Sequence, residues 1–147
     1  MGFFNDIEDH YAAELKAAID TWGLDAANRI WTNVPDKPLV KLPFVSVETI
    51  GLMPGGLQNT DRMELTHEFC IAFPVNQYGR YRYHRDPTND QSLLREILGL
   101  EYNGRKMTFG ELDMIGVEDM ILGGKGAPIK AWTSRIEGVR VYSIPRI

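Results

Sequence analysis

The sequence predicts a single α+β domain, with a mostly antiparallel sheet flanked by two main helices. A helical stripe of apolar residues opens the chain, and segments with strand-like alternation follow it. A second helical stripe then separates these segments from further strand material near the C-terminal end. At 147 residues, with 44% hydrophobic and 24% charged residues, the chain has the size and composition of one folded domain. We therefore expect residues 1–147 to form one domain.

The first predicted element is an amphipathic helix over residues 5–22. Its apolar positions recur at steps of three and four residues and form one stripe, made of Ile7, Tyr11, Leu15, Ala18, Ile19 and Trp22. Asn5 is the expected N-cap, and Gly23 is the expected end of the helix. We expect a further short helical turn within residues 24–31, with Asp25 as its cap.

Two strands are predicted next, over residues 44–50 and 63–75, and we expect them to pair. An extended, proline-containing connector over residues 34–43 precedes the first strand. The second strand alternates strictly, with Leu65, His67, Phe69, Ile71 and Phe73 on one face and Glu64, Thr66, Glu68, Cys70 and Ala72 on the other. Residues 51–61, which are rich in glycine, are expected to form a flexible loop between the two strands.

The middle of the chain predicts a linker, a second helix and a hairpin. Residues 76–85 are expected to be an aromatic and basic linker, and residues 86–90 are expected to start the helix. Its buried stripe comprises Leu93, Leu94, Ile97, Leu98 and Leu100, and Gly99 lies at its end. The Asn-Gly pair within residues 102–105 predicts a type I′ turn.

Two alternatives stay open for the segment that follows the hairpin. The spacing of Thr108 and Glu111 is that of a capping box, which favours a short helix over residues 109–115. The alternative is a strand over residues 112–122. Residues 123–126 are expected to be a flexible loop, and residues 129–144 read as strand material with Glu137-Gly138 as a tight turn or a bulge.

The sequence contains no recognisable catalytic or metal motif, so we expect neither an enzyme nor a cofactor. His10, His67 and His84 lack the spacing of a metal site, and His67 is expected to be a satisfied core or interface residue. Cys70 is the single cysteine, so it can form neither an internal disulfide nor a cysteine zinc site, and a buried thiol is expected. Lys125 stands in a glycine-rich segment that lacks the spacing of a phosphate-binding loop.

Charge and hydropathy bound the possible partners and location. The net charge of −4 and the pI near 5.4 show no basic surplus of the kind that general nucleic-acid binding requires. No run of apolar residues reaches the length of a membrane span, and the first residues do not resemble a signal peptide. We therefore expect a cytoplasmic protein that does not bind a membrane.

The segment at residues 78–85 is the first candidate surface for binding. It interleaves aromatic and basic side chains: Tyr78, Arg80, Tyr81, Arg82, Tyr83 and Arg85. Such a pattern is typical of a stacking surface for single-stranded nucleic acid and also of protein–protein interfaces. Because the chain is acidic overall, we favour the protein interface. The two glycine-rich loops add Met53, Leu57 and Lys125 as candidate contacts.

The chain resembles the tail terminator, or tail completion, proteins of tailed bacteriophages. The resemblance rests on the order of the opening helix, the Leu-Pro-Phe-Val-Ser-Val-Glu strand at residues 42–48, the loop and long strand that reach residue 73, the helix at 90–98 and the strands at 130–144. It covers most of the chain, contains no invariant motif and transfers no catalytic residue. Residues 104–122 are less similar to the family.

The resemblance implies a structural virion subunit at the head–tail junction. Such a subunit forms a ring, hexameric by resemblance, that caps the tail tube, ends its polymerisation and joins it to the neck or connector protein. Assembly takes place in the host cytoplasm, and DNA passes through the lumen without sequence-specific binding, which favours an acidic or neutral inner wall. The alternatives are a head-closure or other neck protein, and a small nucleic-acid- or ligand-binding module that uses the segment at residues 78–85.

Overall fold

A computed structural model describes residues 2–32, 41–54, 61–110, 113–120 and 129–144 of the chain. Its main sheet follows the strand order β1–β2–β3–β8–β6, and β7 also pairs with β8. The strands are β1 (Ile30–Trp31), β2 (Phe44–Pro54), β3 (Arg62–Pro74), β6 (Thr108–Phe109), β7 (Asp113–Met120) and β8 (Ile129–Ser143). Only the β1–β2 pair is parallel among these. The predicted α+β class with a mostly antiparallel sheet is therefore confirmed.

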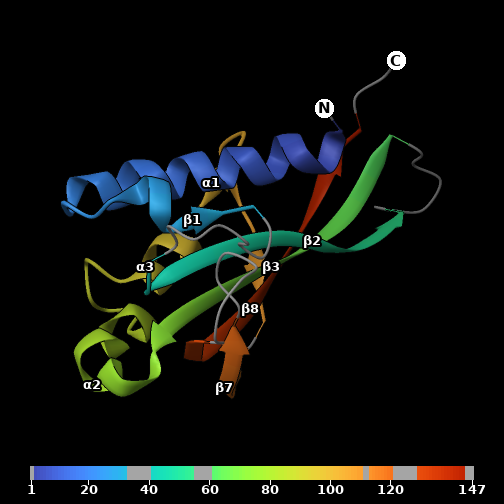
Figure 1. Cartoon of the computed structure of the whole chain (residues 1–147). Coiled ribbons are helices and arrows are strands. Elements are labelled where there is room, and N and C mark those ends of the chain that lie inside the picture. Colours follow the sequence, from blue (N-terminus) through green and yellow to red (C-terminus); the bar gives the residue numbers. More distant parts are fainter. Residues whose placement is uncertain (1, 33–40, 55–60, 111–112, 121–128, 145–147) are drawn as a thin grey trace.

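The opening helix α1 (Phe3–Thr21) lies along one face of the sheet (Figure 1). It begins two residues before the predicted start, with Gly2 at the N-cap position and no side-chain cap, so the prediction that Asn5 caps it is wrong. Gly23 follows the helix with φ of +78°, as predicted for its end. The short 3-10 helix η1 (Ala26–Asn28) confirms the extra turn, although the Asp25 carboxylate accepts from the Asn28 side chain and not from a backbone amide.

The second main helix, α3 (Leu93–Leu98), is shorter than predicted. Its N-cap is Ser92, whose hydroxyl accepts from the backbone N–H of Arg95 at 3.3 Å. The preceding residues do not start the helix, because Asp86 and Asn89 accept from backbone N–H groups two residues on and so form turns. Gly99 takes the C-cap position, as expected.

The predicted hairpin is confirmed between β4 (Glu101–Tyr102) and β5 (Arg105–Lys106), which form a small second sheet. Asn103 and Gly104 have φ values of 52° and 75°. Both central residues therefore have the positive φ that a type I′ turn requires, which explains why Asn and Gly occupy them. Contacts between α1 and β4 place this hairpin beside the opening helix.

The hydrophobic core lies between the sheet and the two helices. The predicted inward face of β3 is confirmed, because Leu65, His67, Phe69, Ile71 and Phe73 are all fully buried. The same core cluster contains the buried stripes of α1 and α3, so both helices cover the same face of the sheet. On the other face the buried thiol of Cys70 follows the prediction, and Phe44, Ala72 and Ala131 form a smaller cluster.

The loop predicted at residues 51–61, between β2 and β3, is wrong for its first four residues. β2 continues to Pro54, so residues 51–54 are strand and not loop, while residues 55–60 lie outside the described part. The register with β3 shifts between Thr49 and Gly51, which makes Ile50 the extra residue of a bulge. A Cβ on Gly51 would lie 3.1 Å from the Thr66 side chain, so glycine suits this close approach. The bulge allows β2 to remain paired beyond it.

The later strands decide the alternatives left open by the sequence. Thr108 and Phe109 pair with Val139 and Gly138 as β6, so the helix predicted from the capping box is wrong, and the strand alternative is correct for residues 113–120. β8 runs through Gly138 with neither turn nor bulge. A Cβ on Gly138 would lie 2.8 Å from Met107 Sδ, and that crowding explains the glycine. Most of the connector predicted at residues 34–43, up to residue 40, and the loop at 123–126 lie outside the described residues.

Candidate interaction surface

The segment predicted as a linker is folded into short helices at the end of β3. It comprises the 3-10 helix η2 (Val75–Gln77), the α-helical turn α2 (Tyr78–Tyr81) and the 3-10 helix η3 (Arg82–Arg85). The linker prediction is therefore wrong. The aromatic and basic composition of this segment favoured an exposed linker. One of its residues, His84, is nonetheless fully buried and holds the segment against the core.

His84 is the anchor of this segment. Its ring lies 4.1 Å from the Tyr83 ring, centroid to centroid, and stacks within 6.4 Å of the rings of Trp22, Phe73 and Tyr81. Its Nδ1 accepts from the Leu93 backbone N–H at 3.4 Å, and its backbone oxygen accepts from the Ser92 hydroxyl at 3.0 Å. These bonds dock the segment on the start of α3.

Burial sets the charge state of His84. Burial first, and the nearby Arg29 charge second, lower the pKa of this imidazole to about 4. The ring is therefore neutral at pH 7, with the proton on Nε2 because Nδ1 accepts a hydrogen bond. Nε2 is buried and has no hydrogen-bond partner within the described ranges. This is a structural histidine, and we assign it no role in catalysis.

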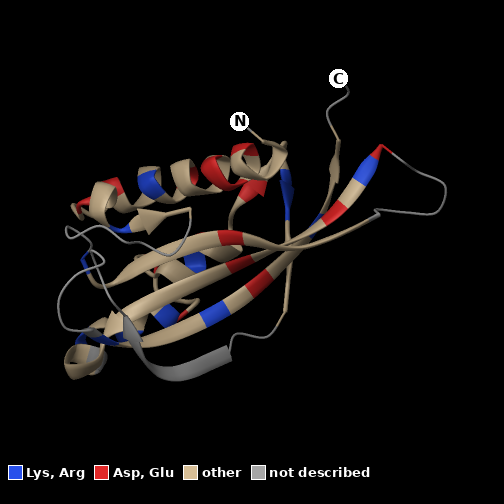
Figure 2. Ribbon diagram, turned by 45° about the vertical axis from the view of Figure 1, so that its right-hand side comes forward, with Lys and Arg blue, Asp and Glu red and all other residues tan. Residues whose placement is uncertain are grey.

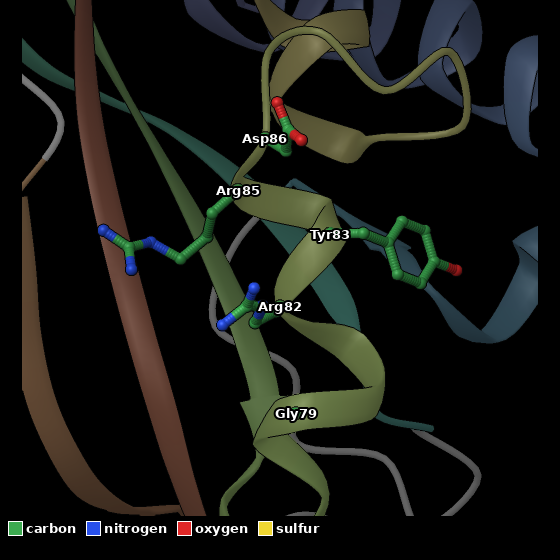
Figure 3. A pocket seen from close by; sticks show the side chains of 5 residues that line it. All are labelled: Gly79, Arg82, Tyr83, Arg85 and Asp86. Carbon is green, nitrogen blue, oxygen red and sulfur yellow. The ribbon is translucent and has the colours of Figure 1, made fainter.

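The arginines of the segment point away from that anchor. A shallow hollow of about 560 Å³ is lined by Arg82, Arg85 and Tyr83, together with Gly79 and Asp86. Figure 3 shows the Arg82 and Arg85 side chains directed to one side of the η3 turn and Tyr83 directed to the other. Arg80 and Arg82 are exposed, whereas Arg85 is half-buried with a buried Nε, and Tyr83 lines the same hollow.

The tyrosines of the segment do not form a stacking ladder for bases. Tyr81 packs against the main core and lies nearly parallel to the His84 ring, at an interplanar angle of 7°. Tyr83 contacts the same ring from another side. The guanidinium carbon of Arg80 lies 5.2 Å from the Tyr81 ring centroid. Because both rings are engaged within the fold, they are poor platforms for single-stranded nucleic acid. The side chain of Tyr78 lies outside the described part.

The other candidate contacts lie elsewhere. Met53 is 55% exposed near the end of β2 and pairs with Glu64 near the start of β3, whereas the segment at 78–85 follows the end of β3. A strand of that length spans roughly 40 Å at about 3.3 Å per residue. The structure therefore does not bring Met53 together with the arginines. Leu57 and Lys125 lie outside the described residues.

Met53 belongs to an exposed apolar group that the sequence analysis missed. We call the exposed large apolar side chains at this end of the sheet the apolar end patch: Phe4, Ile50, Leu52 and Met53, exposed by 37%, 46%, 52% and 55%. Leu52 pairs with Leu65 and Met53 with Glu64, so these two side chains lie on opposite faces of β2. The bulge places Ile50 outside the regular pairing of β2. The Glu8 carboxylate accepts from the Thr49 N–H at 2.6 Å, which brings the first turns of α1 beside the bulge. In the sequence, the break in the strand alternation at Ile50-Gly51 could have indicated this exposed group.

The sheet face opposite the helices carries an acidic row. Glu48 pairs with Glu68, and Glu68 pairs with Glu137, so the three carboxylates lie side by side on β2, β3 and β8. Figure 2 shows the corresponding red bands across the strands. Glu68 is bound by Arg135 at 2.9 Å, while Glu48 and Glu137 are exposed. Like charges directly opposite each other disfavour strand pairing, so neighbouring contacts must offset this repulsion.

A buried polar chain joins α1 to the sheet. The Tyr11 and Tyr142 hydroxyls lie 2.6 Å apart, and Tyr142 also bonds His67 Nε2 at 3.0 Å. His67 Nδ1 bonds the Thr49 hydroxyl at 3.0 Å, so both ring nitrogens are satisfied, as predicted for a core histidine. Burial lowers the pKa of His67 to about 4 and raises that of Tyr142. Neutral groups that link helix and strands have a structural role.

Among the described residues, no group of three His, Cys, Asp or Glu side chains is arranged to hold a metal ion. No described helix combines the length and the hydropathy needed to cross a membrane. Comparison with known proteins finds no matching family model and no matching curated protein.

Proposed function

We propose that the chain is a structural subunit of a ring at the head–tail junction of a tailed phage, where it caps the tail tube. The observation that carries the proposal is the acidic row on the helix-free face of the sheet. A row of carboxylates suits a wall that faces a DNA channel, because it repels the phosphate backbone. The helices cover the opposite face, and Glu48 and Glu137 on this face are exposed, although Phe44, Ala72 and Ala131 elsewhere on it are buried.

The two ends of the sheet support the second half of the proposal. One end carries the apolar end patch, and the other carries the arginine surface of residues 80–85. A terminator must bind two different proteins, tube and connector, and two chemically different ends suit two different partners. Arg and large apolar side chains are residue types that contribute strongly to protein interfaces.

The test is assembly with and without tail tube protein. Native mass spectrometry and negative-stain images of the purified chain are expected to show a closed ring, hexameric by the family resemblance, that attaches to tube ends. Met53→Asp and Arg82→Glu, one at each end, are expected to abolish binding to different partners. A chain that stays monomeric in the presence of tube protein would contradict the proposal.

A head-closure or other neck subunit is the nearest rival, and the same variants separate it. A terminator binds tube protein, whereas a head-closure protein binds the connector and not the tube. The nucleic-acid-binding alternative is weakened by the packing of the Tyr81 and Tyr83 rings against the His84 ring. It predicts salt-dependent single-strand binding that is lost when Arg80, Arg82 and Arg85 are replaced together.

A further inference from the structure

A second cationic site lies at the start of β3, assembled from separate parts of the chain. A cavity of about 330 Å³ is lined by Arg62 at the start of β3, Arg105 in the β4–β5 hairpin and Arg140 in β8. Asn103 and Ser143 add neutral polar groups, and the described residues that line the cavity include no carboxylate. Figure 1 places the start of β3 at the same end of the sheet as both chain termini, away from α2. We call this the arginine cavity.

Arg140 is held in place before any ligand arrives. Its guanidinium carbon lies 4.8 Å from the Tyr142 ring centroid and 5.3 Å from that of Tyr102, and its Nη1 donates to the Tyr102 backbone oxygen. Its Nε is buried and has no hydrogen-bond partner among the residues described. A guanidinium fixed by two rings and a carbonyl loses little entropy when it binds an anion.

The cavity concentrates positive charge, although Glu64 lines a neighbouring hollow together with Arg140. Among the described residues, the ion pairs of His10 with Glu14 and of Arg135 with Glu68 do not involve Arg62, Arg105 or Arg140. Three cations around one cavity repel each other. An anion bound between them would remove that repulsion and would accept their N–H groups.

We propose that the arginine cavity binds a phosphate-bearing ligand. A lone carboxylate carries one charge and is matched by one guanidinium, so it would leave two arginines without partners. A phosphate or diphosphate group carries more charge and more acceptor oxygens, which the three arginines and the Asn103 amide can share. The volume is at the lower end of small-ligand sites, which suits a compact anion. This inference does not rest on the proposed ring function.

The test is isothermal titration of the full chain with pyrophosphate at low salt, without added metal. Arg105→Gln and Arg62→Gln are expected to lower the affinity about tenfold or more each, because each removes a charged donor. Arg82→Gln is the matched control, since it removes an exposed arginine at the other end of β3 and is expected to leave the affinity unchanged. Arg140 is not the first choice for replacement, because it also packs on two rings.

Two further ligands identify the source of the phosphate. Citrate tests for a carboxylate site, and a short single-stranded oligonucleotide tests for a nucleic-acid backbone. Competition by the oligonucleotide, lost in Arg105→Gln and retained in Arg82→Gln, would support the cavity and assign the phosphate to nucleic acid. No binding of pyrophosphate to the wild type, equal weakening by Arg82→Gln, or tighter binding of citrate would each overturn the proposal.

Discussion

The two cationic regions of this protein use the same residue types in opposite ways. In the segment at residues 78–85, the rings of Tyr81 and Tyr83 pack against the His84 ring, and the Arg82 and Arg85 side chains are directed to the other side of the η3 turn from Tyr83. In the arginine cavity, Arg140 lies against the rings of Tyr102 and Tyr142, and two further arginines complete the lining. The first region is contiguous in sequence, whereas the second is assembled from strands that are distant in sequence.

An aromatic and basic composition does not by itself predict a surface on which nucleic-acid bases can stack. Contiguity made the first region visible in the sequence, but the half-buried rings of Tyr81 and Tyr83 pack against His84, which takes up part of the stacking surface that the pattern suggested. The second region has no local signature, yet its arginines surround a common cavity. Each region also contains or adjoins one buried neutral histidine, His84 in the first and His67 beside Tyr142 in the second.

The largest expected effect is a loss of stability in acid, shared between the two histidines. Both have a pKa of about 4 in the fold against an ordinary 6.5, so the unfolded chain takes up protons first as the pH falls. The free energy of unfolding is therefore expected to fall between pH 6.5 and 4, on the order of 3 kcal/mol for each histidine. Urea unfolding at pH 7 and pH 4.5 measures it.

Replacing each histidine singly shows how much of the loss of stability in acid comes from each of the two regions. His84→Phe and His67→Phe are each expected to remove about half of the pH dependence, because each deletes one titrating ring. Equal stability of the wild type at both pH values would show that neither imidazole is held neutral by burial.

Truncation of the anchor tests whether the first region depends on its buried ring. His84→Ala empties a site between aromatic rings and is expected to cost about 2–4 kcal/mol of unfolding free energy. Arg82→Ala, next but one in sequence and exposed, is the control and is expected to change stability by less than about 0.5 kcal/mol. Thermal and urea unfolding compare the two variants. Similar losses from both would mean that the arginine, too, is part of the anchor.

Removal of the Glu8 carboxylate tests the end of the sheet that holds the apolar end patch. Glu8→Ala leaves the Thr49 N–H at the bulge without its acceptor and is expected to cost about 1–3 kcal/mol. Asp9→Ala is the matched control, because Asp9 is exposed on the same helix. Hydrogen exchange at Thr49 should rise in the first variant only. Unchanged exchange there would show that the carboxylate does not protect the bulge.

The smallest expected effect separates ligand binding from stability. Arg105→Gln and Arg82→Gln are each expected to change the free energy of unfolding by less than about 0.5 kcal/mol, because both side chains are exposed. Only the first is expected to lose the stabilisation that saturating pyrophosphate confers on the wild type. A scan of melting temperature against pyrophosphate concentration checks both points. Loss of that stabilisation in both variants would remove the distinction between the two regions.

Local patterns account for the parts of the fold that were predicted correctly. The stripe of α1, the alternation of β3 and the Asn-Gly turn each depend on neighbours within a few residues. The predictions that failed depend on partners far away in the chain. Residues 51–54 stay in β2 because β3 pairs with them. Thr108 and Phe109 join the sheet because they pair with β8.

The α+β class, the inward face of β3 and the basic segment that contains the exposed Arg80 and Arg82 all follow from the sequence. Only the tertiary structure decided that His84 is buried, that three glutamates align across three strands and that Arg62, Arg105 and Arg140 line one cavity. The physical reason is that periodicity fixes which side of an element a residue occupies, whereas strand register and helix docking fix which distant residues become neighbours.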